Sequence, residues 1–213
     1  MKKVSGRKSV DPMPLAAEKR PYLRKRGYRR RRFLSIVFLA AGGFLLGYVG
    51  TEYLDMYLTQ KSLATEWQHQ TSAAVPSGKS AVDTSHGLIR LEIPKIKLDA
   101  MVLEGVSNAE LSKGPGHMEE TPIPGEAGNS VITAHRDTFF RHIFELKAGD
   151  EILVRRNGET LRYQVTSKKI VDPNDVSVLE PTPDPQLTLI TCYPTYYIGP
   201  APRRLVVFSK LVE

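Results

Sequence analysis

The sequence contains a single cysteine, Cys192, among its 213 residues. One cysteine cannot form an intramolecular disulfide, which excludes a disulfide-stapled fold, and it leaves almost no scope for a thiolate metal cluster. A lone cysteine is often a small buried hydrophobic residue, so its presence alone does not indicate catalysis. The chain also lacks the bias of a disordered protein, because 41% of its residues are hydrophobic and 25% are charged. We therefore expect one globular domain with an appendage.

Net positive charge is confined to the N-terminus, although the whole chain has a net charge of +7. Residues 1–32 contain 13 Lys and Arg and only two acidic residues, whereas the rest of the chain has a net charge of −4. A nucleic-acid-binding domain needs a basic face on its folded part. The charge distribution therefore disfavours nucleic acid as a partner.

Residues 33–50 contain no charged side chain and directly follow Arg29–Arg32. Eighteen residues of helix span about 27 Å, close to the thickness of a bilayer core. Because a block of cations stays on the cytoplasmic side, the pattern predicts a basic cytoplasmic tail over 1–32 and a single-pass signal-anchor over 33–50. Everything from residue 51 onward is then extracytoplasmic. A cleaved signal peptide is the alternative, but the run is long and no clear small-x-small cleavage site follows it.

After residue 50 the composition and pattern of the sequence change twice. Residues 51–70 have a helix-compatible composition and are expected to extend the membrane helix as a stalk, and 71–86 form a linker rich in Ser, Ala, Gly and Pro. From residue 87 to 213, short apolar runs alternate with turn residues and predict a mainly β domain, a small antiparallel barrel or sandwich. The expected strands are 88–93, 98–104, 129–135, 151–157, 159–171, 187–193 and 203–212, with short helices at 106–114 and 138–146.

Cys192 lies at the end of one predicted strand, and Arg204 lies twelve residues later at the start of the next. If these strands form a hairpin, the two residues meet at one rim of the sheet. A neighbouring guanidinium favours the reactive thiolate over the thiol and can also stabilise the oxyanion of an acyl-transfer intermediate. The spacing therefore predicts a nucleophile with an electrostatic partner.

Acyl transfer also needs a proton donor for the leaving amine, for which histidine is suited because its pKa lies near working pH. Of the five histidines, His135 ends a predicted strand and His117 lies in a glycine-rich loop. A strand-end histidine is better placed to meet a strand-end cysteine, so His135 is preferred and His117 stays open. The other three lie in the stalk, the linker and a short apolar helix: His69, His86 and His142.

Three segments in order, VITAHRD, LTLITC and APRRLVV, resemble the signatures of the sortase family. The resemblance covers about residues 88–213, and the TCYP-x₇-P-x-R spacing is most like class D sortases. It implies a single closed eight-stranded β-barrel and catalytic roles for His135, Cys192 and Arg204. Arg203 remains the alternative to Arg204, since adjacent residues on a strand point to opposite faces. Ala134 stands where many family members have glycine.

The resemblance further implies a membrane-anchored cysteine transpeptidase without a cofactor. Its partners are secreted proteins that carry a C-terminal sorting motif similar to Leu-Pro-x-Thr-Gly or Leu-Pro-x-Thr-Ala, and an acceptor amine on a cell-wall peptide or a pilin lysine. The expected substrate contacts are Thr191, Tyr193 and Ile198, although the alternative for Thr191 is a β-former on the opposite face. A cysteine hydrolase of the same fold and a non-enzymatic membrane-tethered binding barrel are the rival functions.

No metal site is expected. Asp172, Asp175 and Asp184 lie in the connection before the cysteine strand, spread over thirteen positions. A calcium site needs several oxygen ligands that converge on one point. These aspartates are therefore interpreted as ordinary loop residues.

Overall fold

The computed structural model describes residues 24–72, 87–196 and 199–212, and the chain divides into two compact units, 1–48 and 49–213. The described part of the first unit belongs to α1 (Arg24–Ser72). Between Arg30 and Gln70 this helix is long and apolar enough to cross a membrane: its most apolar 18-residue window has a mean hydropathy of 2.0, and none of that window is buried. The apolar run of the sequence is therefore helical, and its side chains are not buried by the described part of the protein.

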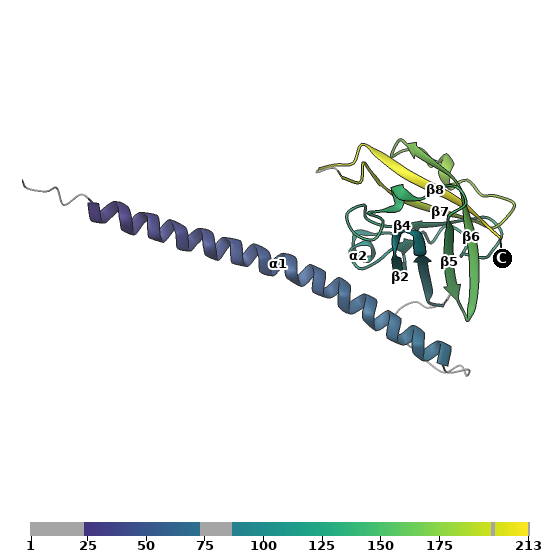
Figure 1. Ribbon diagram of the computed structural model, residues 1–213, viewed down its shortest axis with the longest axis horizontal. Coiled ribbons are helices and arrows are strands. Elements are labelled where there is room, and N and C mark those ends of the chain that lie inside the picture. Colours follow the sequence, from purple (N-terminus) through teal and green to yellow (C-terminus); the bar gives the residue numbers. More distant parts are fainter. Residues whose placement is uncertain (1–23, 73–86, 197–198, 213) are drawn as a thin grey trace, which may run out of the picture. The chain divides into compact units, whose positions relative to one another are not determined.

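The second unit contains a closed barrel of eight strands in the order β1-β2-β3-β4-β7-β8-β6-β5, which confirms the predicted fold class (Figure 1). Two pairs are parallel, β2 with β3 and β4 with β7, and the others are antiparallel. The strands are β1 Ile89–Ile93, β2 Leu98–Glu104, β3 Gly116–His117, β4 Asn129–Thr133, β5 Glu151–Arg156, β6 Glu159–Val171, β7 Gln186–Tyr193 and β8 Arg203–Leu211. The short helices are η1 Pro94–Ile96, α2 Asn108–Leu111, η2 Ile143–Glu145 and η3 Val176–Leu179.

The alternation of side chains along each strand separates an inner core from an outer layer. Leu187 and Leu189 of β7 belong to the barrel core, and both are fully buried. Ile190, the next residue along β7, faces outward and packs in a second cluster with Val206 of β8 and Val178 of η3. The connection between β6 and β7 thus covers part of the outer face of the barrel.

The two-residue strand β3 is the element that the sequence pattern did not reveal. It exists because the backbone comes very close to its neighbour: a Cβ on Gly116 would lie 2.1 Å from the carbonyl oxygen of Gly105. Backbone bonds from Leu103 N to Pro115 O (2.8 Å) and from Gly105 N to His117 O (2.9 Å) tie the segment to β2. Since β3 is so short, most of that edge of β2 has no strand beside it.

The second half of α1 covers this edge, within the same compact unit. Leu63 and Trp67 of the helix pack with Leu88 and with Met101 of β2. The side-chain amide of Gln60 accepts a hydrogen bond from Met101 N (2.8 Å) and donates one to Met101 O (3.0 Å). One helix side chain therefore pairs with the β2 backbone as a neighbouring strand residue would. Residues 51–70 were expected to be a stalk, and the structure shows in addition that they contact the barrel.

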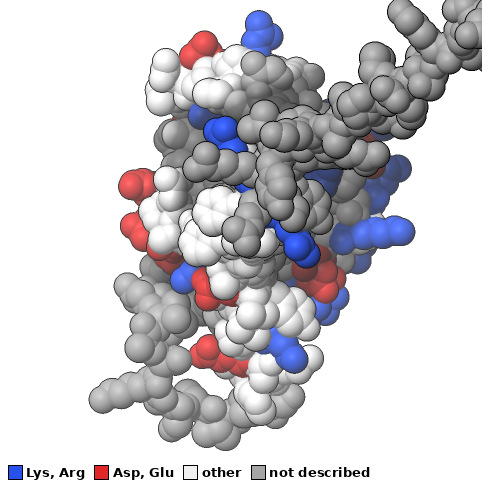
Figure 2. Space-filling model, turned by 90° about the vertical axis from the view of Figure 1, so that its left-hand side faces the viewer, with Lys and Arg blue, Asp and Glu red and all other residues white. Residues whose placement is uncertain are grey.

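Charged side chains on the described surface are mixed in sign. On the face shown in Figure 2, Lys and Arg side chains lie among Asp and Glu side chains. Several are paired across strands, such as Arg90 of β1 with Asp99 of β2 (2.6 Å) and Arg155 of β5 with Glu92 of β1 (3.1 Å). Hydrogen bonding to Arg90 lowers the pKa of Asp99 from its usual value. These exposed pairs add little stability each.

Candidate active site

The candidate site lies where three adjacent strands reach the same rim of the barrel. β7 and β8 form the hairpin that the twelve-residue spacing predicts, and Cys192 pairs directly with Arg204. Residues directly opposite each other on antiparallel strands have their side chains on the same face. Cys192 is partly exposed, as is Arg204. A thiol and a permanent cation therefore share one accessible face of the sheet.

His135 reaches this rim on the parallel neighbour, β4. The register pairs Thr133 with Ile190, and a bond from Ala134 N to Ile190 O (3.3 Å) extends the contact beyond the last ladder pair. His135 is two residues past Thr133, as Cys192 is two residues past Ile190. Continuing the register thus brings His135 alongside Cys192, and His135 is also partly exposed.

Arg203 and Arg204 lie on opposite sides of β8. Arg203 pairs with Tyr193, whose side chain packs against the barrel core, whereas Arg204 pairs with Cys192. The Arg204 guanidinium donates to the carbonyl oxygens of Arg203 (3.1 Å) and Ala201 (3.4 Å). The strand geometry therefore favours Arg204 over Arg203 as the neighbour of the thiol.

Thr191 points away from Cys192 and into the protein. Its side chain is 1% exposed, and its hydroxyl donates to the carbonyl oxygen of Ala134 at 2.7 Å. This bond joins the residue before Cys192 to the residue before His135, so it holds the two strand ends together. The placement agrees with the alternative interpretation of Thr191 as a residue on the opposite face, and its contact with substrate stays a prediction.

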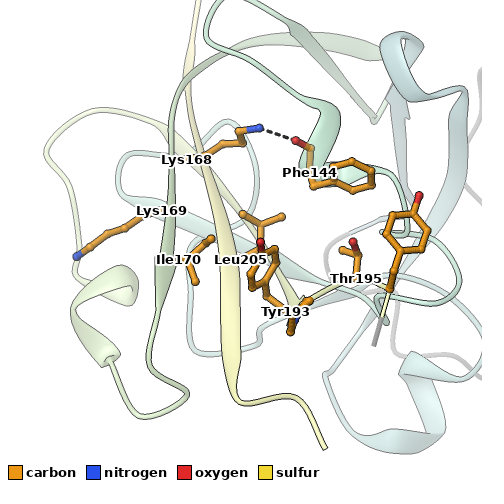
Figure 3. Close-up of a pocket in the computed structure, with 9 residues that line it drawn as sticks. Phe144, Lys168, Lys169, Ile170, Tyr193, Thr195 and Leu205 are labelled. Atoms are coloured by element: carbon orange, nitrogen blue, oxygen red, sulfur yellow. Dashed lines mark hydrogen bonds between the residues drawn. The ribbon is translucent and has the colours of Figure 1, made fainter. Parts of the chain in front are cut away.

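Tyr193 lines a cavity of about 550 Å³ (Figure 3). Because successive residues of a strand alternate, the Tyr193 side chain points to the face of β7 opposite to that of Cys192. The walls of the cavity come from η2, from the second half of β6 and from the β7–β8 connection. The Lys168 ammonium donates to Phe144 O across one side of it, and the Phe144 and Tyr196 rings meet edge to face at 5.5 Å. The lining residues are Phe144, Lys168, Lys169, Ile170, Tyr193, Pro194, Thr195, Tyr196 and Leu205. The third expected substrate contact, Ile198, lies outside the described residues.

The β6–β7 connection forms a wall beside the site on the outer face. The amide of Asn129 donates to the carbonyl oxygens of Val178 (3.0 Å) and Glu180 (3.2 Å) and accepts from the Thr188 hydroxyl (2.6 Å). Asp175 caps η3, and the hydrogen bond from Ser177 holds the pKa of its carboxyl below the usual value. A buried amide on β4 thus anchors this connection over the strands that carry His135 and Cys192.

Two of the remaining described histidines, His117 and His142, have structural partners, and His69 is exposed on α1. His117 is 1% exposed, with Nδ1 2.7 Å from Glu104 Oε1 and Nε2 3.1 Å from Pro122 O. His142 is exposed and pairs with Glu145 in the same turn. His86 lies outside the described residues. Within residues 24–72, 87–196 and 199–212, no group of three or more His, Cys, Asp or Glu side chains could hold a metal ion.

Arg136, the residue after His135, contacts the β7–β8 connection, and the sequence analysis did not predict this contact. Its guanidinium donates to Pro194 O at 3.1 Å and to Gly199 O at 2.5 Å, and both acceptors belong to the β7–β8 connection. No local sequence pattern predicts a contact between residues that are about sixty positions apart. The only sequence signal is the position of an arginine next to a candidate catalytic histidine.

Comparison with known proteins decides the family. A family model described as the sortase domain matches residues 91–212. The chain belongs to the sortase family. This sortase is 31% identical over 196 residues to Sortase D of Bacillus subtilis (strain 168), covering 85% of this chain and 99% of that protein. It is 30% identical over 129 residues to Sortase A of Listeria monocytogenes, covering 59% of this chain and 58% of that protein.

Solved structures agree with the assignment. The fold of this sortase is similar to that of a Clostridium perfringens Sortase D5 transpeptidase, with a TM-score of 0.59 and 24% identity, covering 75% of this chain and 99% of that one. It is also similar to a lid mutant of Sortase A from Corynebacterium diphtheriae, with a TM-score of 0.57 and 28% identity, covering 72% of this chain and 93% of that one. Sortases are cysteine transpeptidases, so family and fold together support a transpeptidase role.

Proposed function

We propose that this sortase is a membrane-anchored class D transpeptidase in which Cys192 is the nucleophile, His135 the acid and base, and Arg204 the oxyanion partner. The observation that carries the proposal is the cross-strand pairing of Cys192 with Arg204 beside the end of β4. The likeness to Sortase D over most of both chains supports the class.

In the first half of the proposed cycle, Cys192 Sγ attacks a backbone carbonyl of a sorting motif similar to Leu-Pro-x-Thr-Gly or Leu-Pro-x-Thr-Ala. The Arg204 guanidinium stabilises the negative charge that develops on the carbonyl oxygen. The C–N bond breaks, and protonated His135 gives its proton to the leaving amine. The product of this half is a thioester between Cys192 and the new C-terminus of the substrate.

In the second half, neutral His135 takes a proton from an acceptor amine, whose nitrogen attacks the thioester. The C–S bond breaks, an amide joins the two substrates, and Cys192 leaves as the thiolate. The acceptor is an amine of a cell-wall peptide or of a pilin lysine. Residues 33–50 hold the enzyme in the membrane, with the N-terminus in the cytoplasm and the barrel outside, where secreted substrates emerge.

The test is a ligation assay with a panel of sorting-motif peptides and an amine such as triglycine, read by mass spectrometry. The fragment used starts at Thr51, so that it keeps the part of α1 that contacts the barrel. We expect a ligated peptide from the wild-type fragment and none from Cys192→Ala. Cleavage without ligation would indicate the hydrolase. Absence of both products and of a Cys192 adduct, with a thiol that resists alkylation in the folded protein, would indicate the binding barrel.

A further inference from the structure

Of the three candidate catalytic residues, His135 lies beyond the end of its strand, whereas Cys192 and Arg204 pair with each other near the end of the β7–β8 ladder. The β4 ladder ends at Thr133, two residues before His135, and the β7–β8 ladder ends with the pair of Tyr193 and Arg203, next to Cys192 and Arg204. Beyond these pairs, the strand backbone no longer fixes the distance between the histidine and the other two residues. The bonds of Ala134 with Ile190 and Thr191 hold the residue before His135, so a further contact at the rim is needed to fix His135 itself.

Arg136 makes such a contact. Its Nη1 donates to Pro194 O, the first carbonyl after β7, and its Nη2 donates to Gly199 O, on the way into β8. One side chain therefore holds two points of the β7–β8 connection, Pro194 just after β7 and Gly199 before β8, against the segment that follows β4. Pro194 is two residues after Cys192, and Gly199 is five residues before Arg204. The residue that makes the contact is the immediate neighbour of His135.

Arginine is suited to this task because its guanidinium is planar and presents several donors in a fixed arrangement. Two carbonyls that accept from the two ends of one guanidinium are held at a defined separation. Because the donor is charged, these hydrogen bonds are also stronger than those between neutral groups. A lysine in the same place has a single ammonium on a flexible stem and cannot span both carbonyls in this way.

We propose that Arg136 is a positioning residue that sets Cys192 and Arg204 relative to His135 by clamping the β7–β8 connection, an inference that rests on the proposed function. The two hydrogen bonds of Arg136 described above reach backbone carbonyls of the connection and not the three candidate catalytic side chains. The connection that it clamps also supplies Pro194, Thr195 and Tyr196 to the wall of the cavity in Figure 3. Loss of the clamp therefore loosens the site and this wall together.

The loosening is expected to be local. On its other side the connection is held by the edge-to-face contact of Tyr196 with Phe144, and the β7–β8 ladder below it has eight register pairs. The two hydrogen bonds that Arg136 donates to Pro194 O and Gly199 O both end on the β7–β8 connection and not on a strand of the barrel. Activity should thus fall much further than stability when the clamp is removed.

The experiment compares the full-length enzyme in detergent micelles with Arg136→Lys, Arg136→Gln and the control Arg141→Gln, which removes an exposed arginine from the same segment. We expect kcat/KM for ligation to fall about 100-fold in both Arg136 variants, mainly through kcat, because a misplacement of about 1 Å costs about that factor. The Tm should stay within a few degrees, and amides in 193–196 and 199–202 should exchange hydrogen faster. Arg141→Gln should match the wild type.

A wild-type kcat in Arg136→Lys would overturn the inference, because it would show that the two-pronged contact is not needed. A loss of activity that follows a loss of Tm would also overturn it, since it would show a general structural role. If the wild-type enzyme ligates no peptide, it is the proposed function that fails. Hydrogen exchange still tests the clamp in that case, and unchanged exchange in both Arg136 variants would overturn it.

Discussion

The contact between Gln60 and the β2 edge predicts that a helix outside the barrel stabilises it. Replacing Gln60 by leucine removes three hydrogen bonds at once: two with the backbone of Met101 and one with Lys113 O (3.1 Å). Met101 is only 2% exposed, so its N–H and C=O have little access to water as a substitute. Each buried backbone group left without a partner costs about 1–3 kcal/mol. We therefore expect Gln60→Leu to lower the free energy of unfolding by about 2–4 kcal/mol.

The chain contains its own probe for this experiment. Trp67 is the only tryptophan, is 7% exposed and lies in the cluster that joins α1 to Leu88 and Met101. Urea unfolding of a fragment starting at Thr51 can be followed by Trp67 fluorescence for the helix and by far-UV circular dichroism for the whole unit. Gln70→Leu is the matched control, since it makes the same change at an exposed position of the same helix.

The result that refutes the reasoning is an equal stability of the Gln60→Leu and Gln70→Leu variants. It would mean that water replaces the amide at no cost and that the helix only rests on the strand edge. A Trp67 transition at lower urea than the circular dichroism transition, seen only in Gln60→Leu, would show that the helix detaches before the barrel unfolds.

Three further predictions concern buried or reactive groups. Burial raises the pKa of Tyr163 to about 12, so its stabilising contribution is complete below about pH 10, the usual value, and is lost as the pH rises from there to about 12. Urea unfolding over this range should show stability falling by up to about 2.7 kcal/mol more in the wild type than in Tyr163→Phe. Arg204→Lys should lower kcat/KM for ligation by about 10²–10³-fold, whereas Arg203→Lys should stay near wild type; equal losses would refute the assignment of the face next to Cys192. Thr191→Val should destabilise the fold by about 1–3 kcal/mol, because the buried carbonyl of Ala134 loses its donor, and no measurable change in urea unfolding would contradict this.

Most strands were predictable because each carries its own alternating pattern. The bounds of β2 and β6 are those that the sequence indicates, and β7 and β8 differ by one residue at one end. The two-residue β3 was not predictable, because it arises from a close backbone approach at Gly116 and not from any pattern of its own. The barrel therefore has eight strands, whereas the alternating pattern in the sequence predicts seven.

The segment 138–146 was expected to be a helix and contains only the short η2. Phe140, Ile143 and Leu146 are all fully buried, so every third residue faces the core. A spacing of three matches the 3₁₀ helix and not the 3.6-residue period of an α-helix. The segment therefore forms the short 3₁₀ helix η2 in place of the expected α-helix, a difference that its composition alone did not reveal.

At the candidate site, too, one contact could be predicted from the sequence and others could not. The pairing of Cys192 with Arg204 follows from a short hairpin, so the spacing in the sequence predicts it. The contacts of Thr191 with Ala134 and of Arg136 with Pro194 each join residues 57 or 58 positions apart. Such contacts depend on which strands become neighbours in the closed barrel. The sequence pattern predicts where most strands begin and end, but it does not predict which strands become neighbours in the barrel.

The order of strands has a consequence for the time at which the site is completed. β8 is the last of the strands in the described residues, yet it lies between β7 and β6 and closes the barrel. It also carries Arg204, so a chain still being synthesised holds its cysteine and its histidine without the residue that faces the thiol. We therefore expect closure of the barrel and pairing of Cys192 with Arg204 to occur together, and a chain that is cut short before Arg203 to lack both.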